Sequence, residues 1–235
     1  MSLKGTVVLI AGGSGALGRT VTPIFARAGA RVITADRDPP PDEIAAGNAM
    51  KTDVTDEAAV RRLVDDVIRT AGRLDVLVNL VGGFAMGPVV ETDLSLWQRM
   101  LTMNVTAAFV LSKAVLPHMV GRGSGRILHI AALAAVEPFP GAAAYIVAKS
   151  SLLALIKVLA LELKGSGVTI NGVLPNTIDT PANRAGMPDA DPSAWTKPES
   201  IANTLLFLAS DEAGQINGAA VPVGTQGGVQ SAAKA

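Results

Sequence analysis

The stretch that decides the fold is Val7-Val8-Leu9-Ile10-Ala11-Gly12-Gly13-Ser14-Gly15-Ala16-Leu17-Gly18. Its first half is a short aliphatic run typical of a buried strand, and a helical pattern begins directly after it. Glycines between a strand and a helix allow a tight turn and a close approach to a pyrophosphate, while the helix N-terminus supplies N–H donors. We therefore expect a dinucleotide site that uses Gly12, Ser14, Gly15, Ala16, Leu17 and Gly18.

Short Val/Ile/Leu-rich runs alternate with segments of helical period along the rest of the chain. Strands are expected at residues 6–11, 31–35, 75–81, 126–131, 168–174 and 219–223, with one more before Asp53, and helices at 17–28, 56–71, 96–119, 142–164 and 198–209. Prolines at positions 39–41 leave little room for a helix before Asp53. The alternation predicts a single doubly wound Rossmann-type α/β domain over residues 1–235, with a parallel sheet of about seven strands flanked by helices.

The composition narrows the class of partner. Twenty basic residues balance 20 acidic ones, so no charge excess favours nucleic acid or an anionic membrane. The chain has no cysteine and only two histidines, which argues against a metal site. The apolar runs are too short for a secretion signal or a membrane span. We expect a cytoplasmic protein with a small-molecule substrate.

Polar residues stand where the expected strands end. Asp36 ends the second strand and would accept hydrogen bonds from ribose hydroxyls, which favours NAD over NADP. Arg37 beside it could pair with a 2′-phosphate and soften that preference. Asp53-Val54 follows the third strand, and Asn79 and Gly82 lie at the end of the fourth. Carboxyl ends of parallel strands bind ligands in open α/β sheets, although solvated strand ends would look the same.

Tyr145, the only tyrosine, stands four residues before Lys149. On a helix this spacing places both side chains on the same face. A neighbouring ammonium would lower the pKa of the phenol from its ordinary value of about 10, so Tyr145 is a candidate acid/base for proton transfer. A chance pair on a helix surface is the alternative that the spacing alone leaves open.

With these motifs the whole chain resembles the short-chain dehydrogenase/reductase family. The resemblance implies an NAD(P)(H)-dependent oxidoreductase that transfers hydride between nicotinamide and a small carbonyl or alcohol substrate. It implies Tyr145, Lys149 and Asn104 as catalytic residues, with Asn104 supporting a water relay to the lysine. It also implies cofactor contacts, to NAD with NADP possible, from Asp53, Val54, Asn79, Gly82, Tyr145, Lys149, Pro175, Ile178 and Thr180.

One position departs from the family pattern. Ala132 stands 13 residues before Tyr145, where the family has its catalytic serine, and positions 127–144 contain neither Ser nor Thr. Losing one oriented hydrogen-bond donor typically costs about 3 to 4 kcal/mol of transition-state stabilisation. The substrate must therefore be held or activated in another way.

Three explanations are open. An ordinary carbonyl oxidoreductase would use water, or the hydroxyl of Thr177 or Thr180, in place of the serine. The loop from Pro175 to Trp195 is similar to that of dihydropteridine reductase-like members, which implies a quinonoid dihydropterin, an electrophile that needs no such donor. The third explanation is an NAD-binding sensor or scaffold without turnover.

Three further expectations concern the surroundings of the site. The loop from Pro175 to Trp195 suits a lid. His129 is expected to be packed or solvated, because strand alternation puts it on the opposite face from Ala132. The apolar character of the helices predicts a homodimer or homotetramer, formed through the helix that begins at Leu96 and ends at Met119 and the one that begins at Ala142 and ends at Lys164.

Overall fold

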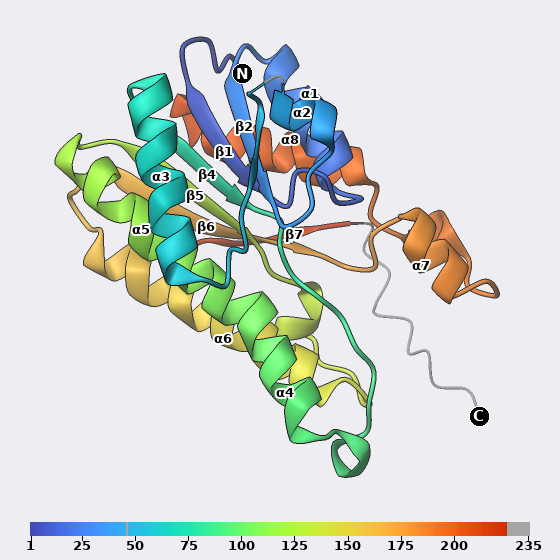
Figure 1. The fold of residues 1–235 in the computed structure, drawn as a ribbon. Helices are drawn as coiled ribbons and strands as arrows, with labels where there is room; N and C mark the ends of the chain where they lie inside the picture. Colours follow the sequence, from blue (N-terminus) through green and yellow to red (C-terminus); the bar gives the residue numbers. More distant parts are fainter. Residues whose placement is uncertain (46, 225–235) are drawn as a thin grey trace.

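A computed structural model describes residues 1–45 and 47–224. Seven parallel strands form one sheet in the order β3-β2-β1-β4-β5-β6-β7 (Figure 1). The strands are β1 (Val7–Ala11), β2 (Arg31–Asp36), β3 (Ala49–Lys51), β4 (Val76–Asn79), β5 (Gly125–Ile130), β6 (Val168–Pro175) and β7 (Ala220–Val223). The predicted doubly wound α/β fold is confirmed. Residues 46 and 225–235 of the predicted domain lie outside the described residues.

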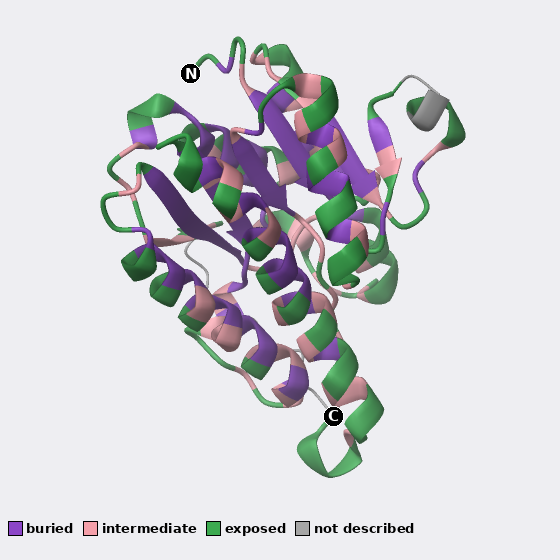
Figure 2. Cartoon of the chain, turned by 60° about the vertical axis from the view of Figure 1, so that its left-hand side comes forward, coloured by how far each residue is buried: buried purple, intermediate pink, exposed green. Residues whose placement is uncertain are grey.

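Helices cover both faces of the sheet. The first layer contains α1 (Gly18–Arg27) and α8 (Pro198–Ala209), and the second contains α3 (Glu57–Ala71), α5 (Ala107–Gly121) and α6 (Ala143–Glu162). Successive strand residues pack against opposite layers: Ile10 packs against the first layer and Leu9 against the second. The sheet is accordingly buried between helices whose outer surfaces are exposed (Figure 2).

Short helical segments complete the chain. They are α2 (Pro41–Ala45), α4 (Leu94–Leu101), α7 (Pro181–Gly186), the 3-10 turns η1 (Val89–Glu91), η3 (Leu133–Ala135), η4 (Pro192–Ala194) and η5 (Asp211–Ala213), and the π-helical segment η2 (Thr102–Thr106). Helix α7 and turn η4 lie within the loop predicted to form a lid, and α7 projects away from the sheet (Figure 1). The lid region is therefore partly helical.

One expectation about helices is wrong, and the bounds of another change. A helix, α2, does form before Asp53, because proline is compatible with the first turn of a helix and Asp42 and Glu43 complement the N-terminal end of its dipole. The helix predicted at residues 96–119 begins at Leu94, where the Asp93 side chain accepts the Leu96 N–H, and it continues through η2 to Gly121. The extra residue in the π turn was not visible as a break in the apolar pattern.

The strand order reverses between β1 and β4. The chain leaves β1 toward β2 and β3, then returns to the other side of β1 to form β4. Such a reversal point is where open α/β sheets bind ligands, outside the carboxyl ends of the strands. The predicted loop after β1 and the turn after β4 meet there: Leu80 N–H donates to Ala11 O at 2.9 Å.

Two helical stretches, Leu94–Gly121 and Ala143–Glu162, are long and apolar enough to cross a membrane by length and composition. The sequence-based expectation did not anticipate this. Their inner faces pack in the core through side chains such as Leu111 and Ile156. Much of the remaining apolar surface faces outward, which leaves these helices without a covering layer in a single copy of the chain.

Candidate active site

The loop after β1 is shaped by glycines that no other residue could replace without movement. Gly12 has φ +87°, in the left-handed region that favours glycine. A Cβ on Gly18, at the start of α1, would lie 2.3 Å from the carbonyl oxygens of both Gly12 and Gly13. The backbone therefore turns as tightly as a pyrophosphate cradle requires, and Gly15 and Ala16 are exposed at its surface while Leu17 is buried beneath. The loop fits a dinucleotide.

The second wall of this loop is the end of β2. The Asp36 carboxylate accepts the Ser14 N–H at 3.1 Å, so it fixes the glycine loop while remaining partly exposed. Burial raises the pKa of Asp36 above its ordinary value, and hydrogen bonds from Ser14 oppose the shift. Arg37 is exposed and lies 3.6 Å from Asp38, which Lys51 also approaches at 3.6 Å. Asp36 thus lies between the glycine loop and the charged side chains of Arg37, Asp38 and Lys51.

Asp53 and Val54 lie next to this wall, where Thr52 N–H donates to Asp36 O at 2.7 Å. Asp53 Oδ1 accepts the Thr55 hydroxyl at 2.6 Å and the Thr55 N–H at 2.9 Å, and these hydrogen bonds lower the pKa of Asp53. Val54 is buried. The predicted adenosine-side residues Asp36, Arg37, Asp53 and Val54 are thus brought to one edge of the sheet.

The turn after β4 is held by two buried asparagines. Asn79 Oδ1 accepts the Val81 N–H at 3.0 Å. Asn104, on the π segment η2, accepts the Gly83 N–H at 3.2 Å and donates to Gly83 O at 3.0 Å. A Cβ on Gly82 would lie 2.8 Å from Asn104 Oδ1 and 3.2 Å from Lys149 Nζ, so Gly82 is the point where the turn meets the lysine.

Tyr145 and Lys149 lie on the first turns of α6, at the carboxyl edge of the sheet. Lys149 is buried and its Nζ donates to Ile130 O, at the end of β5, at 2.8 Å. Burial lowers the pKa of Lys149 to about 8 and raises the pKa of Tyr145 to about 12. The pKa of Tyr145 therefore moves in the direction opposite to the one expected from its lysine neighbour, because burial favours the neutral phenol.

Ala132 follows β5 in an extended conformation and is buried. Further along the chain, on α6, the ring of Tyr145 contacts the ring of Phe84 edge to face, with centroids 4.9 Å apart and planes at 83°. Phe84 is 57% exposed although it is apolar, and no sequence motif includes it. Its place directly after the glycines of the β4 turn, in a chain with only five phenylalanines, was the available signal.

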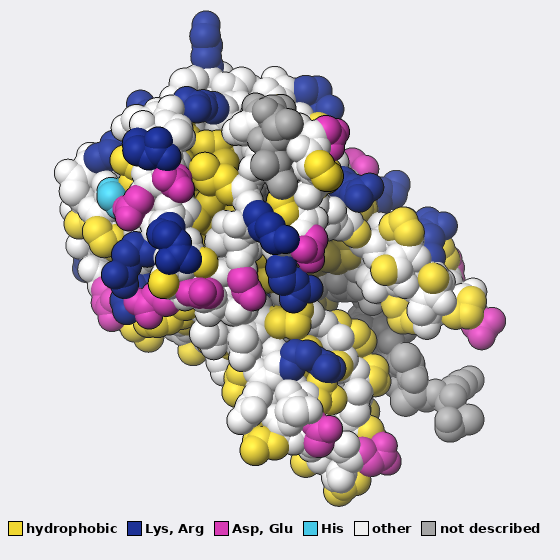
Figure 3. Space-filling model, in the orientation of Figure 1, with side chains coloured by type: hydrophobic (Ala, Val, Ile, Leu, Met, Phe, Trp, Pro, Cys, Tyr) yellow, Lys and Arg dark blue, Asp and Glu magenta, His cyan; other side chains and the backbone are white. Residues whose placement is uncertain are grey.

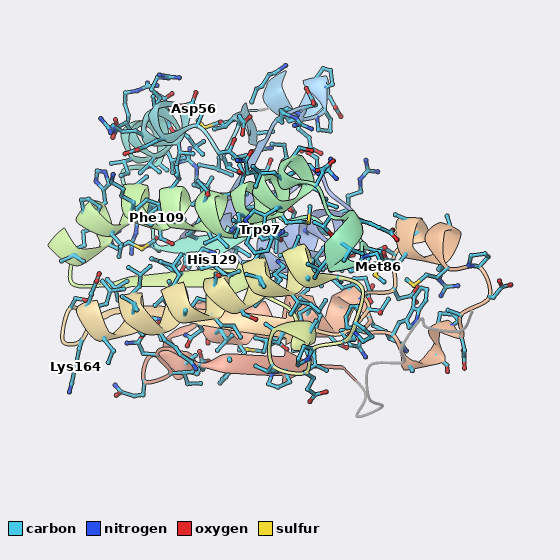
Figure 4. All side chains as sticks on the ribbon, turned by 90° about the horizontal axis from the view of Figure 1, so that it is seen from below. Asp56, Met86, Trp97, Phe109, His129 and Lys164 are labelled. Carbon is cyan, nitrogen blue, oxygen red and sulfur yellow. The ribbon has the colours of Figure 1, made fainter. Side chains whose placement is uncertain are left out.

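Phe84 begins an exposed segment that ends at α4. Met86, Val89, Val90 and Leu94 are each at least half exposed along it. The segment forms the far tip of the molecule, beside the N-terminal end of α4, and Met86 lies on the side of the lid (Figures 3 and 4). A shallow, mostly apolar cavity of about 310 Å³ lies behind it, lined by Val89, Thr92, Asp93, Leu94, Trp97, Ala143 and Ala144.

The lid begins where Pro175 ends β6. Ile178 pairs with Thr196 across a parallel bridge, and Asn183 N–H donates to the Thr180 hydroxyl at 3.2 Å, which caps α7. Arg184 pairs with Asp179 through two hydrogen bonds of 2.6 and 2.8 Å. Pro175, Ile178 and Thr180 thus lie at the base of the loop predicted to form a lid, and the hydroxyl of Thr180 is already engaged in a helix cap.

In the part of the chain that the structure describes, no group of three or more His, Asp or Glu side chains lies close enough to hold a metal ion. The candidate site therefore consists of a glycine loop, an acidic strand end, the β4 turn and the Tyr145–Lys149 pair. All of them lie at the carboxyl edge of one sheet.

Comparison with known proteins identifies the family. A family profile described as Enoyl-(Acyl carrier protein) reductase matches residues 12–229. The 3-oxoacyl-[acyl-carrier-protein] reductase FabG of Thermotoga maritima is 30% identical, with 97% of this chain and 99% of that protein covered. The meso-2,3-butanediol dehydrogenase of Serratia marcescens is 33% identical, with 95% and 94% covered. A short-chain type dehydrogenase/reductase from Mycobacterium ulcerans has a similar structure, with a TM-score of 0.87, 28% identity, and 94% and 89% covered. The chain is an oxidoreductase and belongs to the short-chain dehydrogenase/reductase family.

Proposed function

We propose that this enzyme transfers hydride between NAD(H) and a small carbonyl or alcohol substrate, with Tyr145 as the proton donor or acceptor. The observation that carries the proposal is the Tyr145–Lys149 pair on α6, set against Gly82 and the end of β5 at the carboxyl edge of the sheet. In this proposal Lys149 holds the nicotinamide ribose. Asn104 holds the Gly83 backbone and supports the water behind the lysine.

The residues present fit a dinucleotide. The glycine loop would hold the pyrophosphate, Asp36 the adenosine ribose, Asp53 and Val54 the adenine, and Asn79, Gly82, Pro175, Ile178 and Thr180 the nicotinamide half. When bound, the dihydronicotinamide supplies the hydride. NAD is favoured because a 2′-phosphate would meet the Asp36 carboxylate and would have to compete with Asp38 for Arg37.

The protonation states suit reduction. With its pKa raised to about 12, Tyr145 keeps its proton at neutral pH and can donate it to the oxygen of a carbonyl as the carbon receives hydride. Lys149, with its pKa lowered to about 8, is still charged at pH 7 and can attract the ribose hydroxyls and stabilise negative charge on the reacting oxygen.

The substrate has to tolerate Ala132. An apolar methyl group stands where a hydroxyl would orient a carbonyl, and the ring of Phe84 supplies further apolar surface against Tyr145. We infer that the preferred substrate is an activated carbonyl compound, which needs less help from a donor. A quinonoid dihydropterin is the second candidate, favoured by the same alanine and by the likeness of the lid sequence.

We also propose a homodimer or homotetramer built on the outer faces of α5 and α6. Five large apolar side chains are exposed there, Phe109, Val120, Val147, Val158 and Leu161. We take these side chains as the partner surface, because large exposed apolar patches mark interaction sites. The cytoplasmic location expected from the sequence stays a prediction.

The test is an assay of NADH and NADPH oxidation with a panel of simple ketones, activated 1,2-dicarbonyls and a quinonoid dihydropterin. We expect turnover with NADH and the activated carbonyls. Tyr145→Phe should lower kcat by about 100-fold or more while the Kd for NADH stays within a few-fold, because only proton transfer is lost. Ala132→Ser should raise the activity on simple ketones by about tenfold.

Each arm can contradict the proposal. A fully active Tyr145→Phe variant would remove Tyr145 from the chemistry, and tighter binding of NADPH than of NADH would overturn the argument from Asp36. Turnover of the pterin alone would favour the second candidate. Binding of NADH without turnover of any substrate would favour a non-catalytic NAD-binding protein.

A further inference from the structure

A buried histidine that the proposed chemistry does not use lies under the site. His129, on β5, is fully buried between helix α5 and the sheet (Figure 4). It is paired in register with Asn79 on β4. Its Nδ1 lies 3.2 Å from Asn79 Nδ2, and its Nε2 lies 3.0 Å from the Ser112 hydroxyl on α5. A buried polar chain of this kind stabilises a single arrangement, because each member would be costly if left unpaired.

The hydrogen bonds fix the state of the imidazole. Asn79 Oδ1 has to face the Val81 N–H that it accepts, so the Asn79 amide nitrogen faces His129. An amide nitrogen only donates, and His129 Nδ1 must therefore be an unprotonated acceptor. The single proton of the neutral ring is then on Nε2, where it is donated to Ser112 Oγ.

The surroundings support the neutral state independently. Burial and the positive charge of Lys149 lower the pKa of His129 to about 3. A second proton would also place an N–H of the ring against the N–H of Asn79. His129 is therefore a fixed acceptor over the pH range in which a typical histidine titrates.

Through Asn79, the acceptor nitrogen of His129 holds the turn after β4. Asn79, oriented by His129, holds Val81, and the next residue, Gly82, lies where a Cβ would press on Lys149 Nζ at 3.2 Å. Asn104 holds Gly83 from the other side. The position of the turn therefore decides how tightly Lys149 is enclosed and where the nicotinamide side of the site ends.

We propose that His129 is a positioning residue: through Asn79 it sets the turn at residues 80–83 against Lys149, and so keeps the lysine desolvated and the nicotinamide half of the site in place. Ser112 fixes the tautomer that this requires. The inference rests on the proposed function only for its kinetic readout.

The kinetic test compares His129→Leu, His129→Asn and the matched control His118→Asn, whose histidine is partly exposed on α5. His129→Leu removes the acceptor, so kcat/KM should fall by about tenfold or more. The alkaline pKa of kcat/KM should rise by about half a unit or more, because water reaches Lys149. His129→Asn can offer an oxygen acceptor near the Nδ1 position and should stay within about threefold of the parent enzyme. A role in stability alone would lower the Tm of His129→Leu and leave the alkaline pKa unchanged, which would overturn the proposal.

A second measurement decides the point without turnover and without a folded His129→Leu variant. The chain has two histidines, so ¹⁵N-histidine NMR of the parent protein, assigned with His118→Asn, gives the tautomer of His129 directly. We expect the neutral Nε2–H form, unchanged from about pH 5 to 9. An Nδ1–H tautomer, or titration in this range, would show that Asn79 is not oriented as inferred. If NADH binds but no substrate is turned over, two readouts still test the proposal. They are the tautomer of His129 from NMR and the NADH affinity of the His129 variants.

Discussion

At the scale of single residues, the pKa values of Tyr145 and Lys149 make a prediction about pH. In the free enzyme both groups are protonated at pH 7, because burial raises the pKa of Tyr145 to about 12 and lowers that of Lys149 to about 8. Reduction needs the Tyr145 proton and the Lys149 charge. We therefore expect kcat/KM for carbonyl reduction to be level near neutral pH and to fall about tenfold per pH unit above pH 8.

The pH dependence of NADH-driven reduction measures this alkaline limb. Lys149→Arg, which cannot lose its charge in this range, should be much less active but should show no fall near pH 8. A limb that appears unchanged in Lys149→Arg would belong to another group, and the assignment to Lys149 would be wrong.

The residue scale also shows where reasoning from sequence reached its limit. The four-residue spacing predicted that Tyr145 and Lys149 share a helix face, and they do lie together at the start of α6. It could not predict their pKa values, because these depend on burial by segments distant in the sequence; the ring of Phe84, from the turn after β4, packs on Tyr145, and Lys149 reaches the end of β5. His129 was expected to be packed or solvated and is fully buried, but its partner Ser112 carries no sequence signal.

At the scale of elements, the lid helix α7 offers a local test. It is six residues long, and its N-cap is Thr180, whose hydroxyl accepts the Asn183 N–H. Thr180→Ala should cost about 1 kcal/mol of local stability. Hydrogen exchange of the amides in the last turn of α7 should then become roughly fivefold faster, while exchange in β1 and β4 is unchanged.

The matched control is Thr204→Ala, which removes an exposed hydroxyl that donates to Ser200 O on α8. It should leave exchange in α7 unaltered. If Thr180→Ala also leaves α7 unaltered, the helix is held by the Asp179–Arg184 pair rather than by its cap.

Helix and strand positions were predicted to within a few residues where the apolar period is strong, as in α3 and α6. The π segment was not predicted, although it carries Asn104, because one inserted residue shifts the apolar face without interrupting it. Helix α2 was not predicted because three consecutive prolines argue against a helix, whereas the third of them begins this one.

At the scale of the whole molecule, the alternation of strands and helices was enough to predict a parallel sheet with two helical layers. The strand order depends on which side of β1 each crossover takes, and that is decided by packing between distant segments rather than by local pattern. The oligomeric state is likewise not decided by local pattern, since a single chain shows an exposed apolar surface but not the partner that would cover it.

The outer faces of α5 and α6 make the last prediction. Val158 and Leu161, one turn apart on α6, are 51% and 75% exposed. If a second copy covers them, the double variant Val158→Glu, Leu161→Glu places like charges opposite each other in a desolvated interface, which costs several kcal/mol. Light scattering after gel filtration should then find the parent protein as a dimer or tetramer and the double variant as a monomer. Phe207→Glu, on the exposed surface of α8, is the control and should keep the parent's mass. A monomeric parent at tens of micromolar, or a double variant that keeps its mass, would mean that this face is not the one that assembles.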